Sequence, residues 1–249
     1  MCGRYTVTKP EQIAEDLEAV LELAVTGDPW WKPRFNVAPT QPAPVVTAHV
    51  GGRGRQRTIE LMRWGLVPHW ADLAGKRPPL MINARLESLN AKQFFREALQ
   101  RKRCLVPTDG FFEWVRAQPA GHKPKPPPKP FYFRPRARQL AAFAGLWARS
   151  TDEHGAELHS FTIITARASD LVRPIHDRMP IVLEPGAYDA WLDPAVDGEA
   201  ARELLGEAGP GDWTREPVST RVNKVDHDDP GCIAPDAESA TAVQGRLFD

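Results

Sequence analysis

The sequence predicts a single α+β domain, in which an antiparallel sheet or irregular barrel is flanked by helices. Three observations support this fold class. The 249 residues are 42% hydrophobic and 26% charged, which is an ordinary globular composition. Short apolar runs bounded by Gly, Pro or Asp dominate the middle of the chain, as is typical of strands. The regular alternation of strands and helices that builds a parallel α/β sheet is missing.

The expected elements follow in order along the chain. Residues 10–25 space Ile13, Leu17 and Leu21 at helical intervals with acidic residues between them, so we expect one amphipathic helix there. Short strands are expected at 44–49, 58–63, 104–107, 131–133, 141–147, 160–165 and 180–183. Helical patterns return at 91–101, 167–174, 187–193 and 198–207.

Two segments are expected to lie outside the compact core. The segment 117–130 contains six prolines, so it cannot form a helix or a central strand and should be an exposed loop. Residues from about 226 onward are acidic and poor in apolar groups, which is typical of a flexible tail. The predicted boundaries are therefore a domain at 1–225 and a tail at 226–249.

The cysteines and the N-terminus indicate the compartment. Cys2, Cys104 and Cys232 are too few and too scattered for a disulfide framework or a metal cluster, so we expect no metal and no cofactor. The first residues contain no apolar stretch of signal-peptide length. We expect a cytoplasmic, nucleoid-associated monomer without a membrane partner.

The formal net charge of zero conceals an asymmetry along the chain. Residues 53–138 carry 19 basic and 6 acidic side chains, whereas residues 183–249 carry 5 basic and 15 acidic ones. Such a charge block can bind an anionic partner, but it can equally be a solvated surface. Charge alone leaves both interpretations open.

Cys2 is the residue whose position carries the most chemistry. A small side chain after the initiator Met normally allows an aminopeptidase to remove Met1, which leaves a free N-terminal cysteine. An α-amine has a pKa of about 7.7–8.0, against about 10.4 for lysine, so it is the better Schiff-base former near neutral pH. An aldehyde captured by that amine lies next to the thiol of the same residue, and the ring closure would give a thiazolidine.

Six short motifs extend this observation across the chain. They are MCGRY at 1–5, RFNVAP at 34–39, WGLVPHW at 64–70, NARLES at 83–88, CLVPTDGFFEW at 104–114 and IHDRMP at 175–180. Together, and in this order, they resemble the SRAP (SOS-response-associated peptidase) family of abasic-site shielding proteins. The likeness continues to VSTRVNKV at 218–225.

The resemblance implies an SRAP-like fold and a protein that acts in the DNA damage response. It implies covalent linkage to the ring-opened sugar of abasic sites in single-stranded DNA. The catalytic residues that it implies are Cys2 as nucleophile, Asn83 to hold the N-terminus, Glu113 to exchange protons and His176 to assist Schiff-base formation. A carboxylate and an imidazole suit the proton transfers of imine formation.

The same resemblance suggests the residues that contact DNA. Those to which it assigns DNA contact are Arg4, Asn36, Trp70, Arg85, Thr165 and Arg178. The three arginines would clamp phosphates, because a guanidinium group binds phosphate in a bidentate manner. Trp70 would stack on a base or wedge beside it, although a tryptophan in the core is the competing interpretation.

Two other functions remain open from the residues alone. Cys2 and His176 would also suit acyl transfer, as in a cysteine-type peptidase or autopeptidase that removes its own Met1. A non-catalytic module that binds single-stranded DNA would need no chemistry at Cys2. Salt distinguishes the binding module, because phosphate-driven binding weakens with ionic strength and a covalent adduct does not.

The chain ends in Gln244-Gly245-Arg246-Leu247-Phe248-Asp249. This ending resembles the QxxLF-type peptide by which bacterial repair and replication proteins bind the sliding clamp. In such peptides Gln244 would fill a polar pocket, while Leu247 and Phe248 would fill an apolar groove. A chance ending, or a Leu-Phe pair folded back on the domain, is the alternative.

Overall fold

The computed structural model describes residues 2–51, 54–70, 80–115, 127–136, 140–152, 154–207 and 212–236. The strands are β1 (Arg4–Val7), β2 (Ala19–Val20), β3 (Arg34–Val37), β4 (Pro42–Gly51), β5 (Gly54–Trp64), β6 (Asn83–Arg85), β7 (Arg103–Thr108), β8 (Gly110–Val115), β9 (Lys129–Pro135), β10 (Ala141–Thr151), β11 (Glu157–Arg167), β12 (Arg178–Pro180), β13 (Val182–Leu183) and β14 (Trp213–Pro217). The α-helices are α1 (Ile13–Asp16), α2 (Leu23–Thr26), α3 (Gln93–Arg101), α4 (Tyr188–Leu192) and α5 (Gly198–Glu207).

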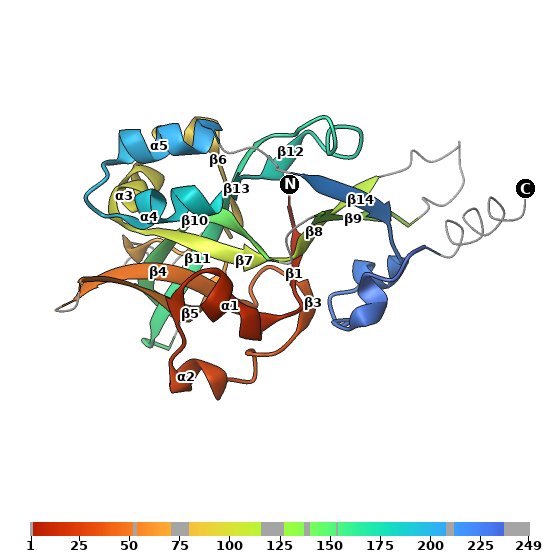
Figure 1. Ribbon diagram of the computed structural model, residues 1–249, viewed down its shortest axis with the longest axis horizontal. Helices are drawn as coiled ribbons and strands as arrows, with labels where there is room; N and C mark the ends of the chain where they lie inside the picture. The colour runs from red at the N-terminus through yellow and green to blue at the C-terminus, as the bar shows by residue number, and fades with distance from the viewer. Residues whose placement is uncertain are drawn as a thin grey trace, which may run out of the picture.

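Five strands close into a barrel at the centre of the molecule. β4 pairs with β5, β10 with β11 and β7 with both β10 and β4, all antiparallel. A parallel pairing of β5 with β11 completes the ring (Figure 1). The α+β fold with an irregular barrel core is therefore confirmed.

Aromatic residues fill the barrel and join it to the N-terminal strand. The Trp64 and Phe161 rings stack with centroids 6.4 Å apart, and Tyr5 of β1 meets Trp64 edge-on at 5.1 Å. All three side chains are buried. Since burial of large aromatic side chains dominates core energetics, this cluster fixes the start of the chain against the barrel.

A second sheet in the order β14-β9-β8-β1-β3 extends from the barrel, and a smaller core lies beneath its outer end. Phe112, Tyr132 and Val222 pack there with Cys232. In Figure 1 this sheet and the blue C-terminal segment lie at one end of the molecule, and α3, α4 and α5 lie at the other. No helix within the described ranges is long and apolar enough to span a membrane.

Two of the predicted helices are wrong. The pattern at 10–25 gives a 3-10 turn at Pro10–Gln12 and the short helices α1 and α2, because Glu18 adopts a positive φ of 49°, and Ala19–Val20 then pairs with β5. A left-handed residue ends a helix, and no periodicity of apolar residues reveals it. The segment 167–174 begins as the end of β11 and continues as hydrogen-bonded turns.

The segment 226–236, in which the tail is expected to begin, is folded against the domain. The Asp228 carboxylate accepts hydrogen bonds from the backbone N–H groups of Phe35 (2.6 Å) and Asn36 (2.9 Å), and it also pairs with Arg34. Composition misses this order because the segment is held by polar contacts. The predicted clamp-binding ending and most of the proline-rich loop lie outside the described residues.

Candidate active site

The far end of β11 brings two of the sequence motifs together. Thr165 pairs with Arg85 of β6 along one edge and with Pro180 of β12 along the other. β6 begins at Asn83, and the loop that precedes β12 carries His176. Strand pairing therefore places the NARLES and IHDRMP motifs on either side of one strand end.

Asn83 ties the start of the chain to this strand end. Its Nδ2 donates to the carbonyl oxygen of Cys2 at 2.8 Å. Asn83 Oδ1 is buried, and no hydrogen-bond partner for it lies among the residues that the structure describes. Because Nδ2 already donates to Cys2 and Oδ1 is available as an acceptor, the Asn83 amide can orient an N–H group without adding charge.

Glu113 on β8 places a buried carboxylate beside Cys2. β8 pairs with β1, where Arg4 lies opposite Phe112, so Glu113 is brought to the start of the chain. Cys2 is fully buried and Glu113 is 3% exposed. Burial raises the pKa of the Cys2 thiol well above its ordinary value, and the negative charge of Glu113 raises it further. The thiol is therefore neutral at physiological pH.

Replacing Glu113 with glutamine should make the Cys2 thiol easier to ionise. The Glu113→Gln variant removes the neighbouring charge and keeps the burial, so the thiol pKa should fall only part of the way toward its ordinary value. The measurement is the rate of iodoacetamide modification at Cys2 between pH 7 and 11, followed by peptide mass. Cys232 serves as the internal control. An unchanged or higher midpoint at Cys2 would contradict this electrostatic coupling.

His176 lies in the loop before β12, and its side chain is 29% exposed. The backbone N–H of Arg178 donates to its Nδ1 at 3.0 Å. The Asp177 carboxylate is equally close to Nδ1, but a backbone N–H is a fixed donor, so in the neutral ring we place the proton on Nε2. His176 can therefore present an N–H donor from Nε2 toward an oxygen atom.

Arg4 and Asn36 form an internal connection between the N-terminus and the segment near residue 222. Arg4 Nη1 donates to Asn36 Oδ1 and to the Val222 carbonyl, both at 2.9 Å. Asn36 is fully buried, and its Nδ2 donates to carbonyl groups of the same segment, the shortest bond being 2.7 Å to His227. In this conformation the polar atoms of Asn36 are occupied within the protein, whereas Arg4 stays half-buried beside the Trp114 ring.

Arg178 is buried against acidic and carbonyl partners. Its two Nη atoms donate to both carboxylate oxygens of Glu87 at 2.7 and 2.9 Å, and Nη2 also donates to the Thr165 carbonyl at 2.7 Å. Thr165 is fully buried as well. The charge of Arg178 is therefore balanced by Glu87, and the pKa of the Glu87 carboxyl is lowered, chiefly by the hydrogen bonds from Arg178.

Arg85 and Trp70 are the expected DNA-contact residues that face solvent. Arg85 is exposed at the end of β6. Trp70 is 46% exposed, which disfavours the alternative of a core tryptophan. An accessible guanidinium and an accessible indole are suited to phosphate contact and base stacking respectively.

Sequence reasoning missed Glu87 and Trp114 as parts of this site. Glu87 follows Arg85 by two residues in the NARLES motif, and Trp114 follows Glu113 directly. Trp114 Nε1 donates to Asn223 Oδ1 at 2.6 Å, which joins the FFEW and VSTRVNKV motifs. The only signal for these two residues in the sequence was that they belong to the quoted motifs. Their contact partners are distant in the sequence.

Comparisons with known proteins identify the family of this chain. The profile of the family described as SOS response associated peptidase (SRAP) matches residues 1–225. The abasic site processing protein YoqW of Bacillus subtilis is 34% identical over 237 residues, covering 94% of this chain and 99% of that protein. The abasic site processing protein YedK of Escherichia coli is 30% identical over 242 residues, covering 94% of this chain and all of that protein.

A solved structure supports the fold. A protein from Bacteroides thetaiotaomicron superposes with a TM-score of 0.80, covering 94% of this chain and all of that chain. Its sequence identity is 22%, so the comparison is evidence for the architecture alone.

Proposed function

Because this chain belongs to the SRAP family, we propose that it processes abasic sites in DNA, by linking Cys2 covalently to the ring-opened sugar in single-stranded DNA. One observation carries the proposal. The first residue of the processed chain is held in a buried site by the Asn83 amide, beside the Glu113 carboxylate. This arrangement is suited to an N-terminal cysteine that captures an aldehyde.

The proposed reaction has two stages. After Met1 is removed, the Cys2 amine adds to the C1′ aldehyde of the sugar, and the resulting carbinolamine loses water to give an imine. The Cys2 sulfur then adds to the imine carbon and its proton passes to nitrogen, which closes a five-membered thiazolidine. The overall balance is one aldehyde and one aminothiol giving one thiazolidine and one water.

The chemistry of three side chains suggests a role for each, two of them beside Cys2 and the third, His176, in the loop before β12. Asn83 Oδ1 can accept an amine N–H and direct the nitrogen lone pair toward the aldehyde. Glu113 can take the thiol proton, and His176 Nε2–H can donate to the departing oxygen.

The raised thiol pKa favours attack by the amine before the sulfur. A neutral buried thiol is a poor nucleophile at pH 7, whereas roughly a tenth of an α-amine with a pKa of about 7.7–8.0 is unprotonated there. Peptidase chemistry would need the opposite preference, with a thiolate that attacks first. A neutral thiol is therefore more consistent with attack by the amine first than with attack by a thiolate first.

Intact-mass measurement with a uracil-excised single-stranded oligonucleotide tests the proposal. The protein lacking Met1 should gain the mass of the oligonucleotide minus one water, and this adduct should survive heating with Cys2 resistant to alkylation. The Cys2→Ala variant keeps the amine but lacks the sulfur, so its imine should be captured only when borohydride is present. Cys104→Ala is the matched control and should crosslink as the wild type does.

An equally heat-stable adduct from Cys2→Ala without borohydride would contradict the thiazolidine. So would a wild-type protein without Met1 that forms no adduct at all.

A further inference from the structure

The turn between β11 and β12 encloses a basic hollow beside the candidate active site. The residues that line it are Arg167, Ala168, Arg173, Asp177 and Arg178, and its volume is about 470 Å³. None of the roles derived above for the site uses Arg167 or Arg173.

The available positive charge in this hollow comes from two of its three arginines. Arg178 is committed to the Glu87 carboxylate by two hydrogen bonds. Arg167 is exposed. Arg173 is 69% exposed, donates a long hydrogen bond to the Ala168 carbonyl at 3.5 Å and pairs with the more accessible Asp170 at 3.0 Å. Since exposed ion pairs are worth little in water, Arg173 can exchange Asp170 for another anion at small cost.

The acidic residue in the lining does not cancel this charge. The Asp177 side chain is 86% exposed, and its carboxylate lies 3.0 Å from Nδ1 of the His176 imidazole. The lining as a whole contains three guanidinium groups and one carboxylate, so positive charge is in excess there. The hollow is left with a net affinity for anions.

The backbone of the turn is held in place. Ala168 N–H donates to the Asp177 carbonyl at 2.9 Å, which closes the ends of the turn, and Arg173 N–H donates to the Ser169 carbonyl at 2.8 Å. Arg215 of β14 donates to the Leu171 carbonyl at 2.8 Å from outside. A rigid frame reduces the entropy lost when the hollow binds a ligand.

The register of β11 gives the distance from the reacting residue. Asn83, which holds Cys2, pairs with Ile163, and the hollow begins at Arg167, four residues farther along the same strand. At about 3.3 Å per residue this separation is about 13 Å. A phosphate in the hollow would therefore belong to a neighbouring nucleotide rather than to the abasic one.

We propose that this hollow is an anion subsite in which Arg167 and Arg173 bind a backbone phosphate of the single strand that flanks the abasic site. The identity of the ligand rests on the proposed function, but the subsite takes no part in the reaction at Cys2. Arg178 acts here as a positioning residue that fixes the wall of the hollow through Glu87 and Thr165.

Non-covalent binding tests the subsite apart from the crosslinking reaction. The probe is a single-stranded 11-mer with a central tetrahydrofuran, an abasic analogue that has no aldehyde. The Arg167→Ala/Arg173→Ala double variant should bind it about fivefold more weakly at low salt, and the slope of log affinity against log salt should become shallower by about 0.7. At saturating abasic DNA, its adduct yield should equal that of the wild type.

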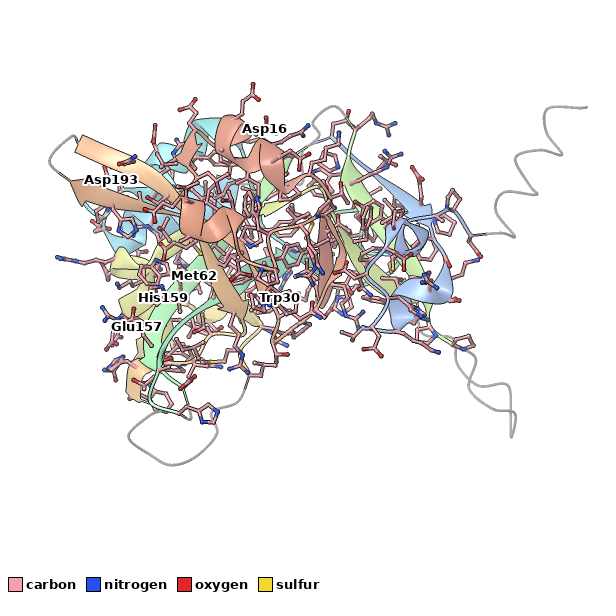
Figure 2. All side chains as sticks on the ribbon, turned by 90° about the horizontal axis from the view of Figure 1, so that it is seen from below. Asp16, Trp30, Met62, Glu157, His159 and Asp193 are labelled. Carbon is pink, nitrogen blue, oxygen red and sulfur yellow. The ribbon has the colours of Figure 1, made fainter. Side chains whose placement is uncertain are left out.

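Arg149→Ala is the matched control. Arg149 is also exposed and paired to a carboxylate, Glu157, but it lies opposite His159 near the other end of β11. Figure 2 shows Glu157 and His159 together, away from the C-terminal segment. Unchanged affinity and salt slope in the double variant, or an equal loss in Arg149→Ala, would overturn the subsite. Failure of the adduct assay alone would overturn only the covalent proposal.

Discussion

A protein whose first residue cannot be removed should bind abasic DNA but form no thiazolidine. The ring requires an amine and a thiol on the same residue, and an uncleavable peptide before Cys2 turns its nitrogen into an amide. An amide nitrogen cannot add to the aldehyde at a useful rate, so the heat-stable adduct should fall below detection. Intact mass with the uracil-excised oligonucleotide measures this directly.

The matched control for this experiment carries the same peptide followed by a protease site that leaves Cys2 as the first residue. Cleavage should restore the adduct. Binding to the tetrahydrofuran oligonucleotide should be retained before cleavage, because the predicted phosphate contacts do not involve the amine. A thiazolidine mass on the uncleaved protein would refute the mechanism.

The substitution Arg103→Ala should be among the most destabilising in the barrel. Arg103 begins β7, is 4% exposed and donates to backbone carbonyls around the ends of α3 and α4. Its acceptors are the carbonyls of Leu99, Gln100, Trp191, Asp193 and Val196. Removing the side chain leaves these carbonyls without their donor and opens a cavity, which should cost about 3–5 kcal/mol of unfolding free energy.

Thermal and urea unfolding measure this loss, and the midpoint temperature should fall by roughly 10 °C for a domain of this size. Arg202→Ala is the matched control, because Arg202 lies on α5 near the same region but its side chain is 38% exposed and only loosely paired with Glu199. Its effect should stay within about 0.5 kcal/mol. A midpoint for Arg103→Ala within a degree of that control would show that the carbonyl cluster contributes little to stability.

The strands of the barrel could be predicted from the sequence because their signal is local. β7 and the first part of β10 are buried on both faces, so each reads as an uninterrupted apolar run between turn residues. The closure of the ring could not be predicted, since the parallel pairing of β5 with β11 joins segments about 100 residues apart. Apolar periodicity indicates that a segment is buried, but it does not indicate which strand the segment pairs with.

The identity of the candidate catalytic residues was likewise available from the sequence, through six motifs in order. Only the tertiary structure shows which of the residues around the catalytic candidates are engaged in contacts inside the protein. From their residue types alone, Arg178 and Asn36 would be expected to face solvent and contact DNA. In the structure both are buried among partners from distant segments.

The sequence by itself determined the fold class, the family and the chemistry available at Cys2, because composition, local apolar patterns and short motifs are all written in consecutive residues. The tertiary structure alone decided that Glu18 interrupts the first helix, that Asp228 anchors the segment after 226, and that Arg167 and Arg173 share a hollow. Each of these depends on a backbone conformation or on a partner far along the chain. Such relations are fixed only when the whole domain has packed.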